Sequence, residues 1–433
     1  MPSTARLPEE LTEEYARTLD QADELAPFRE RFAIPQRNGT PVVYLCGHSL
    51  GLMPKDAPAA IAQELDAWAR LGVEGHFHAP RPWFSYHREV SAALAELLGA
   101  LPHEVVAMNS LTVNLHLLLA SFYQPRGQRR KILLEHFPFP SDLYVAQTHV
   151  RWHGLDPQDV LELLAPRPGE ATLRTEDTCR RIEELGEELA LVFMSGVHYY
   201  TGQRFDVEAI TAAAHRAGAL AGFDLAHAIG NVELRLHDWE VDFAAWCSYK
   251  YLNSGPGGVG GIFVHERHGL DPGRFRLGGW WGTPESVRFQ LLEEFSPAPG
   301  AEGWQLSNAP ILPLAVHRVA LRLFQEAGPE RLYRKRERLT AYAQRWIDYV
   351  RSRLPAAPLR VITPPPPERG AQLSLLVERD GGKLYSALQE ANIVVDWREP
   401  NVIRLAPVPL YNSFADLYRF GQALLQAAHV LWG

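Results

Sequence analysis

Short apolar runs alternate with helical patterns through the middle of the chain. Amphipathic segments lie between the runs, such as Asp206–Gly218, which begins with an N-cap residue and ends at a glycine. This order is typical of an α/β fold in which helices wrap a mostly parallel sheet. The strands are expected at Val105–Asn109, Lys131–Glu135, Leu191–Ser195, Leu220–Asp224 and Ala244–Ser248.

Helical patterns also flank this region. Apolar residues recur at a spacing near 3.6 after Pro54 and again over Val90–Leu98, which predicts two helices ahead of the sheet. The pattern is helical again over Pro310–Arg353, and strand-like runs with a final helix, Phe414–Leu431, follow a stiff loop at Pro364–Pro367. We therefore expect a segment 1–50 that packs on the small domain, a large domain 51–310 and a small C-terminal α+β domain 311–433.

The composition is that of an ordinary globular protein, with 46% hydrophobic and 22% charged residues in a chain of 433. A formal net charge of -8 gives no basic field for a phosphate backbone, so nucleic acid is not expected as a partner. No stretch approaches the roughly 20 apolar residues that span a bilayer. The acidic start of the chain lacks the basic-then-apolar order of a secretory signal. We expect a cytoplasmic protein with no membrane partner.

Cysteine and histidine usage agrees with this expectation. Cys46, Cys179 and Cys247 are odd in number and widely spaced, which fits reduced thiols better than a disulfide framework. His76 and His78 are two residues apart but have no further spaced ligands, so no metal is expected.

The most informative segment is Ser248-Tyr-Lys-Tyr-Leu-Asn-Ser-Gly-Pro-Gly257, in which Lys250 follows an apolar strand and enters a glycine-rich loop. The glycines of Gly255–Gly261 indicate backbone that passes something closely, and a strand resumes at Ile262–His265. A lysine among buried neighbours loses its charge easily and can form an imine with an aldehyde. From this segment alone, a lysine that merely reaches the surface is equally consistent with the pattern.

A second segment favours the imine. Phe223-Asp-Leu-Ala-His227 ends a strand upstream of the lysine, at the carboxyl edge where open α/β sheets bind ligands. Asp224 could hold a proton on a pyridine nitrogen and make the ring a stronger electron sink. An aspartate at a strand end is often only a helix cap, but its combination with the downstream strand-Ser-x-Lys is much less expected by chance.

Phosphate needs donors, and Asn109-Ser-Leu-Thr-Val-Asn114 offers them where a strand passes into an apolar helix. Helix N-terminal N–H groups and the Thr112 hydroxyl suit a dianion. Plain N-capping by Ser110 or Thr112 explains the same residues. After the next strand, Phe139 could stack on a planar cofactor, beside Ser141 and Asp142, although a phenylalanine is more often a core residue.

Taken together, these segments resemble the kynureninase family, within the aspartate-aminotransferase-like (fold type I) pyridoxal-phosphate enzymes, from about Tyr44 to Phe420. The run Arg404-Leu-Ala-Pro-Val-Pro-Leu-Tyr-Asn-Ser-Phe414 is the most specific, because it separates kynureninases from cysteine desulfurases and aminotransferases. The resemblance implies a fold type I transferase-like architecture and pyridoxal 5'-phosphate as the cofactor. The other supporting stretches are Leu45–Lys55, Arg81–Trp83, Asn109–Asn114, the Asp224 and Lys250 segments, Gly278–Gly282 and Leu306–Ile311.

The resemblance also implies a role for each matching residue. Lys250 corresponds to the Schiff-base lysine, Asp224 to the partner of the pyridine nitrogen and Phe139 to the residue stacked on the ring. Tyr249 is a candidate acid at the substrate's Cβ. Arg404 corresponds to the arginine that holds the substrate's α-carboxylate, for which a structural ion pair is the alternative. The remaining cofactor positions are Leu111 and Thr112 in the phosphate turn, helped by Ser195 and Tyr249, together with Ser141, Asp142, His227, Trp280 and Asn308.

The implied reaction is hydrolysis of L-kynurenine, or its 3-hydroxy relative, to anthranilate, or 3-hydroxyanthranilate, and L-alanine, in the kynurenine pathway. Trp280 and Asn308 match positions that the family builds across a dimer interface, which implies a homodimer with shared active sites. Substrate contacts are expected at Arg404, Ser49, His76 and Asn308. One departure puts recognition of the aromatic part in doubt: His48 stands where the family's early GNSLG pattern has its asparagine.

Two rivals stay open on the sequence. A class V aminotransferase or a cysteine desulfurase shares the fold, but a desulfurase needs a mobile thiol, and no cysteine sits in an obvious exposed loop near the C-terminal third. A binding or regulatory protein that kept the fold without catalysis would not need Lys250, Asp224 and Arg404 together. Absence of a yellow cofactor would favour it.

Overall fold

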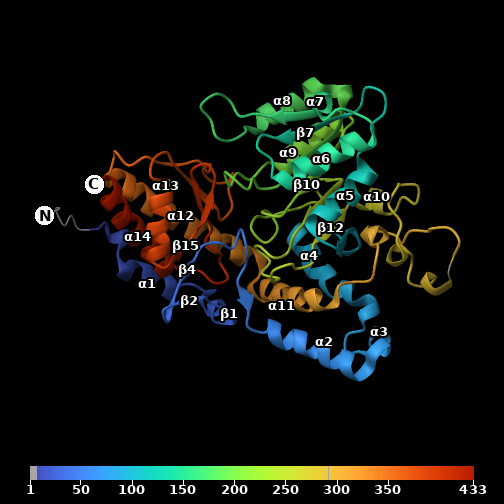
Figure 1. The fold of residues 1–433 in the computed structure, drawn as a ribbon, viewed down its shortest axis with the longest axis horizontal. Coiled ribbons are helices and arrows are strands. Elements are labelled where there is room, and N and C mark those ends of the chain that lie inside the picture. Colours follow the sequence, from blue (N-terminus) through green and yellow to red (C-terminus); the bar gives the residue numbers. More distant parts are fainter. Residues whose placement is uncertain (1–6, 291) are drawn as a thin grey trace. The chain divides into compact units, whose positions relative to one another are not determined.

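The computed structural model describes residues 7–290 and 292–433, so the first six residues of the predicted segment 1–50 lie outside it. The chain divides into two compact units (Figure 1). The larger unit comprises residues 56–199 and 203–322. The smaller unit comprises the described residues up to Lys55, Tyr200–Gly202 and Leu323–Gly433.

A seven-stranded sheet forms the centre of the larger unit. β11, β10, β9, β7 and β8 are parallel to one another, whereas β12 is antiparallel to both of its neighbours, β11 and β6. This confirms the predicted α/β fold with a mostly parallel sheet. The strand order is β6 (Val105–Ala107), β12 (Gly261–Val264), β11 (Phe243–Trp246), β10 (Leu220–Asp224), β9 (Leu189–Ser195), β7 (Lys131–Glu135) and β8 (Leu161–Leu164).

The central strands are buried along almost their whole length, as expected when helices cover a parallel sheet. β7 and β10 have the predicted bounds, and the others begin or end within a few residues of them. β8 was not predicted. It lies at the edge of the sheet, its side chains are mostly half-buried, and Glu162 interrupts its apolar run, so it lacks the continuous apolar pattern of its neighbours.

Helices connect and cover these strands. α9 begins where the sequence predicted, because the Asp206 side chain accepts a hydrogen bond from the Ala209 backbone N–H at 3.0 Å. The α-helices of this unit are α2 (Ala57–Leu71), α3 (Gly75–His78), α4 (Ser91–Leu98), α5 (Leu111–Phe122), α6 (Pro140–Trp152), α7 (Pro157–Val160), α8 (Thr175–Leu185), α9 (Val207–Arg216) and α10 (Glu266–Gly269). α11 (Ile311–Ala327) includes residues of both units.

The smaller unit is built on a four-stranded antiparallel sheet, in the order β13 (Leu359–Val361), β14 (Leu373–Val377), β17 (Val402–Leu405) and β16 (Asp396–Arg398). A short strand near the start of the chain, β4 (Val43–Tyr44), pairs in parallel with β15 (Ile393–Val394). The helices are α1 (Glu13–Gln21), α12 (Pro329–Arg353), α13 (Gly381–Glu390) and α14 (Phe414–Trp432).

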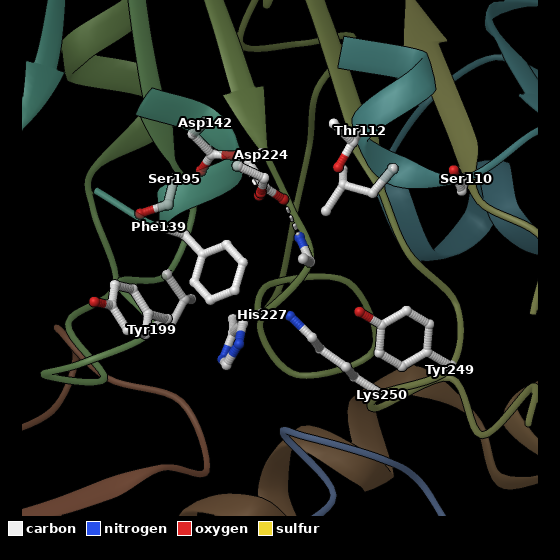
Figure 2. Close-up of a pocket in the computed structure, with 14 residues that line it drawn as sticks. Ser110, Thr112, Phe139, Asp142, Ser195, Tyr199, Asp224, His227, Tyr249 and Lys250 are labelled. Atoms are coloured by element: carbon white, nitrogen blue, oxygen red, sulfur yellow. Dashed lines mark hydrogen bonds between the residues drawn. The ribbon is translucent and has the colours of Figure 1, made fainter. Parts of the chain in front are cut away.

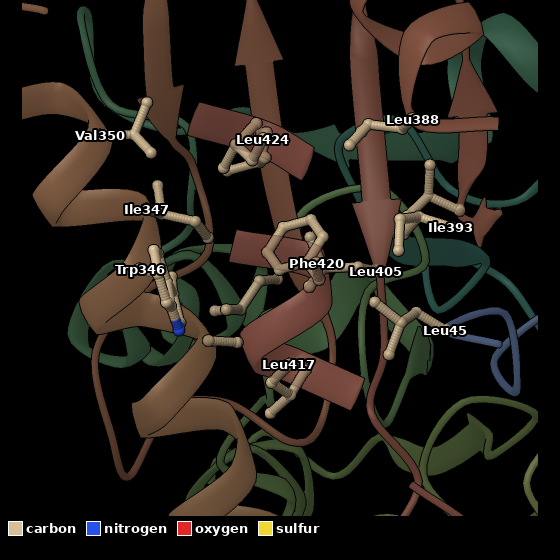
Figure 3. Close-up of a cluster of buried hydrophobic side chains, with 14 of the residues drawn as sticks. Leu45, Trp346, Ile347, Val350, Leu388, Ile393, Leu405, Leu417, Phe420 and Leu424 are labelled. Carbon is tan, nitrogen blue, oxygen red and sulfur yellow. The ribbon is translucent and has the colours of Figure 1, made fainter. Parts of the chain in front are cut away.

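The core of the smaller unit lies between this sheet and its helices. Figure 3 shows Trp346 of α12 and Phe420 of α14 in the same cluster as Leu45 and Leu405. A methyl group at Gly421 would lie 1.9 Å from the Trp346 ring, which explains a glycine inside α14. Burial of each large apolar side chain stabilises the fold by about 1.5–3 kcal/mol.

None of the helices in the described ranges is long and apolar enough to cross a bilayer.

Candidate active site

Functional side chains gather at the carboxyl edge of the large sheet. β9 and β10 end at Ser195 and Asp224, which face each other in register, and β7 ends at Glu135. Lys250 comes soon after the end of β11 on the other side of β10. Because parallel strands bring their carboxyl ends to one edge, residues far apart in the sequence meet here.

A cavity of about 200 Å³ opens at this edge (Figure 2). Of the residues predicted to bind the cofactor, all except Trp280 and Asn308 line it. The lining residues are Ser110, Leu111, Thr112, Phe139, Ser141, Asp142, Ser195, Val197, Tyr199, Asp224, Ala226, His227, Tyr249 and Lys250.

Two buried carboxyl groups form one end of the cavity. Asp224 and Asp142 are 5% and 3% exposed, and the two side chains are hydrogen-bonded to each other. Asp224 also accepts a hydrogen bond from the Ala226 backbone N–H at 2.7 Å. Burial raises the pKa of both groups, and the charge of Asp224 raises that of Asp142 further. This end of the cavity therefore favours a positively charged partner.

A third buried carboxyl lies next to them. The Ser195 hydroxyl donates to Glu135 Oε1 at 2.6 Å, and the Ser195 backbone N–H donates to the same oxygen at 3.1 Å. Burial raises the pKa of Glu135 to about 7. Ser195 thus lies beside Asp224 and Asp142, whereas Figure 2 shows Thr112 on the other side of the cavity. This position differs from the predicted one beside the phosphate turn.

The start of α5 forms that other side. Ser110 occupies the N-cap position, but its side chain makes no capping hydrogen bond, so the N–H groups of the first turn are not satisfied by it. The Thr112 side chain is directed into the cavity (Figure 2). Ser110 therefore does not act as a simple N-cap. The backbone N–H groups of the first turn of α5 remain available to bind an anion.

The turn before α5 has a defined shape. Asn109 has a left-handed backbone with φ of 49°, and its side-chain amide donates to Asn114 Oδ1 at 3.1 Å. The glycine-rich loop passes closely behind it, since a Cβ at Gly260 would lie 2.8 Å from Trp246 O and 3.2 Å from the Ser110 carbonyl carbon. This confirms the close backbone approach that the glycines indicated.

Lys250 is directed into the cavity rather than outward. Its Nζ lies 5.7 Å from the centre of the Phe139 ring and 5.9 Å from that of Tyr249. Burial raises the pKa of the Tyr249 phenol, so this group keeps its proton near neutrality. The sequence left open the alternative that Lys250 merely reaches the surface. The observed position of its side chain does not agree with that alternative.

A second group of predicted residues lies in the smaller unit. Arg404 on β17 is only 1% exposed, and its guanidinium donates to Asp396 Oδ2 at 2.8 Å. The Ser49 hydroxyl donates to the same carboxylate, and Arg404 donates to Ser49 Oγ at 3.3 Å. The structure thus brings two predicted substrate contacts together. Arg404 forms the structural ion pair that the sequence left open as the alternative, with a partner, Asp396, that the sequence did not identify.

Comparison with known proteins identifies the family to which this chain belongs. Residues 43–361 match the class-V aminotransferase model, and residues 332–424 match the model of the kynureninase C-terminal domain. The chain is 52% identical over 415 residues to the kynureninase of Myxococcus xanthus, covering 95% of this chain and 96% of that protein. It is 50% identical over 414 residues to the kynureninase of Flavobacterium johnsoniae, covering 95% and 97%. The chain belongs to the kynureninase family.

Solved structures of the same fold are more distant in sequence. A cysteine desulfurase from Escherichia coli superposes with a TM-score of 0.75 at 16% identity, covering 94% of this chain and 99% of that one. A second, from Thermococcus onnurineus, gives a TM-score of 0.72 at 20% identity, covering 90% and 95%. These likenesses confirm the fold type I architecture, and the kynureninase matches support the main prediction over the aminotransferase and desulfurase alternatives.

Pyridoxal 5'-phosphate is the cofactor of this family, and the cavity fits it. The amine of Lys250 suits the aldehyde, and the first turn of α5 with Thr112 suits the phosphate. Phe139 offers a ring face at the side of the cavity. The buried carboxyl groups of Asp224 and Asp142 need a cation, which a protonated pyridine nitrogen supplies.

The remaining predicted residues lie elsewhere in the larger unit of this kynureninase-family chain. Trp280 is 51% exposed, and its Nε1 donates to Arg288 O at 2.8 Å. Asn308 is exposed, and His76 is half-buried with its ring 5.6 Å from that of Trp83. None of these three residues is among those that line the cavity.

Sequence reasoning missed three residues at these sites. Glu135 ends a strand at the same edge as Asp224, so its position could have been found by the same argument. Tyr199 lines the cavity from the loop after β9, without a motif to mark it. Asp396 faces Arg404 in the strand register, which a sequence does not reveal. The free thiols of Cys46, Cys179 and Cys247 do not line the cavity.

Proposed function

We propose that this protein hydrolyses the Cβ–Cγ bond of L-kynurenine and of its 3-hydroxy relative. One water is consumed, and the products are anthranilate, or 3-hydroxyanthranilate, and L-alanine. The single observation that supports this most is the convergence of Lys250, Asp224 and the uncapped start of α5 on one cavity, in a chain about half identical to kynureninases over 95% of its length.

We assign the cofactor contacts as follows. Lys250 holds the cofactor covalently, Asp224 keeps the pyridine nitrogen protonated and Phe139 packs on the ring face. Leu111 and Thr112 hold the phosphate at the start of α5, with help from Tyr249. The bound cofactor supplies an electron sink for charge that develops on the substrate's carbon atoms. Ser141, Asp142, Ser195 and His227 complete the binding surface.

Two residues of the chain are assigned proton transfers. Once the substrate has displaced it from the cofactor, the freed Lys250 amine would take the proton from the substrate's α-carbon as a general base. Tyr249 delivers a proton to Cβ, a role that its raised pKa supports because the phenol remains protonated near neutrality. The Phe139 ring, the Tyr249 ring and the Lys250 amine surround the same space (Figure 2). One bound substrate could therefore reach both proton-transfer groups.

Substrate recognition is assigned to the guanidinium of Arg404 and to residues at the aromatic end. Arg404 holds the α-carboxylate, with Asp396 and Ser49 fixing the orientation of its guanidinium. His76 and Asn308 are proposed to contact the aryl ring. A site that hydrogen-bonds a hydroxyl discriminates against the analogue without it, which favours 3-hydroxykynurenine as the preferred substrate.

We propose that the active unit is a homodimer, with Trp280 and Asn308 completing a neighbouring subunit's site. Trp280, Phe77 and Phe289 are each at least half exposed, and their rings contact one another, Phe77–Phe289 at 6.4 Å and Trp280–Phe289 at 5.5 Å. Contiguous exposed aromatic side chains of this kind typically mark an interface.

The three free thiols support a reducing compartment, so we place the enzyme in the cytoplasm, in the breakdown of tryptophan.

The dimer is tested by mixing inactive Trp280→Ala and Lys250→Ala proteins. If subunits share sites, half of the randomly exchanged dimers contain one intact site, and activity recovers to roughly a quarter of wild type. Native mass spectrometry verifies exchange. Exchange without recovered activity would show that each subunit carries a complete site.

The reaction itself is tested by incubating the purified holoenzyme with L-kynurenine and with 3-hydroxykynurenine. L-Kynurenine should give anthranilate, followed by its fluorescence, and 3-hydroxykynurenine should give 3-hydroxyanthranilate. Each should form in an amount equal to that of alanine. Absence of both products from either substrate, with the cofactor bound, would refute the proposed function.

A further inference from the structure

A second cluster of ionisable side chains lies at the amino ends of the parallel strands, opposite the carboxyl ends that form the cofactor cavity. Glu104 directly precedes β6, His265 directly follows β12, and the antiparallel pairing of β6 with β12 brings these ends together. His237 lies in the loop before β11. The Lys250 segment follows the other end of β11, so the length of this four-residue strand, roughly 13 Å at about 3.3 Å per residue, separates the cluster from the cofactor cavity.

The three side chains converge on a small volume. Glu104 Oε1 lies 3.0 Å from His237 Nδ1 and 3.8 Å from His265 Nδ1, and all three atoms are within 4.8 Å of one another. Ligands about 2.0–2.1 Å from a tetrahedral metal ion are roughly 3.4 Å apart. The two separations lie on either side of this value. A metal ion lies near the plane of each imidazole that ligates it, so one of the two stacked rings must rotate when the ion binds.

The carboxylate is held in place by backbone donors. The Leu101 N–H donates to Glu104 Oε2 at 2.9 Å, and the Glu266 N–H donates to Oε1 at 2.8 Å. Glu104 is fully buried. Such hydrogen bonds fix the direction of a ligand in the way that outer contacts do in metal centres.

The histidines present suitable nitrogen atoms. His265 Nδ1 accepts a hydrogen bond from the Arg267 N–H at 3.2 Å, so this nitrogen carries its lone pair, as a metal ligand must. The rings of His237 and His265 are stacked, with centres 5.0 Å apart and planes 11° from parallel, and both direct Nδ1 to the same carboxylate. The His237 side chain is 30% exposed, which leaves a path from solvent.

Nearby basic side chains are paired with other carboxylates. Arg267 donates to Asp242 Oδ1 at 2.7 Å, and His268 donates to the same oxygen at 2.7 Å. His103 pairs with Glu266 at 3.2 Å. Among the residues that the structure describes, Glu104 forms no ion pair with an arginine or lysine. Its basic partner is His237, whose pKa the Glu104 hydrogen bond raises, and a metal ion would take over this role.

We propose that Glu104, His237 and His265 form a binding site for a divalent transition metal ion, with zinc as the best match to a two-histidine, one-carboxylate set. Binding replaces the Glu104–His237 hydrogen bond and the Arg267 N–H contact with three metal–ligand bonds. The proton on His237 Nδ1 is released to solvent, and the ring keeps or gains its proton on Nε2. The fourth position is taken by water. The ion joins three segments that are distant in sequence, so its role is to stabilise the larger unit rather than to take part in substrate cleavage.

The test uses the holoenzyme after removal of adventitious metal with a chelator. Co²⁺ alone is titrated while its visible d–d absorption is recorded, and Zn²⁺ binding is measured by calorimetry. We expect one ion per chain and an increase of Tm with the ion present. His237→Phe keeps the stacked ring but removes the ligand nitrogen, and should weaken binding at least ~10²-fold and abolish the Tm increase.

Three further variants make the result decisive. His103→Phe, at an exposed histidine next to Glu104, and Cys179→Ser, at the most accessible thiol, should bind like wild type. His237→Gln replaces His237→Phe if circular dichroism shows that the phenylalanine variant is misfolded. No stoichiometric binding to wild type, binding that survives loss of His237, or binding that disappears in Cys179→Ser would overturn the site and leave a hydrogen-bonded cluster. Turnover of kynurenine is not read, so this outcome is independent of the proposed function.

Discussion

Replacement of Asp224 by asparagine isolates the effect of one buried charge on catalysis. Asparagine has nearly the same shape, and its amide oxygen can still accept the 2.7 Å hydrogen bond from the Ala226 N–H. The substitution removes negative charge at a position that is 5% exposed. A hydrogen bond to a charged group is worth about 1.5–3 kcal/mol, and about 1.4 kcal/mol corresponds to a tenfold change in rate. We therefore expect kcat for L-kynurenine to fall roughly 10- to 100-fold.

The matched control is Asp142→Asn, which replaces the neighbouring buried carboxyl group while leaving Asp224 in place. Burial and the charge of Asp224 raise the pKa of Asp142, and the hydrogen bond from Asp142 lowers the pKa of Asp224. An asparagine amide can donate the same hydrogen bond, so Asp224 keeps its charge and kcat should fall less than tenfold. Both variants are compared by steady-state anthranilate release, with circular dichroism and cofactor content as controls for folding and loading. A near-normal kcat in Asp224→Asn, or equal losses in the two variants, would remove Asp224 from the proposed role.

Three further predictions concern the other assigned residues. Borohydride reduction of the holoenzyme followed by peptide mapping should label Lys250, and Lys250→Ala should lose the covalent bond; a label on a different lysine would contradict the assignment. Arg404→Lys should lower kcat/KM for kynurenine and 3-hydroxykynurenine alike, by about 1–3 kcal/mol in transition-state free energy, because both carry the α-carboxylate; a loss for only one of them would place Arg404 elsewhere. Asn308→Thr should change the ratio of kcat/KM between the two substrates, and an unchanged ratio would show that Asn308 does not contact the ring.

The central sheet was predictable because its order follows from short-range patterns. Continuous apolar runs with intervening amphipathic segments predict buried parallel strands, and the same argument places strand-terminal polar residues at one edge. That is why Asp224 and Lys250 were found together. β8 was not predicted because an edge strand is only half-buried and tolerates a charged residue such as Glu162. Its sequence therefore lacks the continuous apolar run that marks a buried strand.

The contacts that the sequence did not reveal are long-range and depend on strand register. Asp396 and Arg404 meet because β16 and β17 are antiparallel with these residues opposite each other. Glu104 and His237 are 133 residues apart and meet through the pairing of several strands. Neither pair has a spacing or motif that marks it. The metal site could not be proposed from the sequence, where the pair considered as ligands, His76 and His78, lies on the short helix α3.

Glu135 leads to a prediction about how pH affects the stability of the cofactor-free protein. Burial raises its pKa from the ordinary 4.5 to about 7, although hydrogen bonds from Ser195 oppose this change. A folded-state pKa above the unfolded value gives stability that is fully present below about 4.5 and is lost as pH rises through about 7. Between about pH 5 and pH 8 this costs roughly 2–3 kcal/mol. Glu135→Gln does not titrate at this position and keeps an oxygen acceptor for Ser195. From about pH 5 to pH 8, its free energy of unfolding should therefore fall by roughly 2–3 kcal/mol less than that of the wild type. Urea unfolding at both pH values measures the difference, with Glu176→Gln, at an exposed position of α8, as the control for loss of a surface charge. Equal pH dependence in wild type and Glu135→Gln would show that Glu135 does not exchange a proton with the solvent near neutrality, and would leave Asp224 and Asp142 as the groups that bind the proton in this buried cluster.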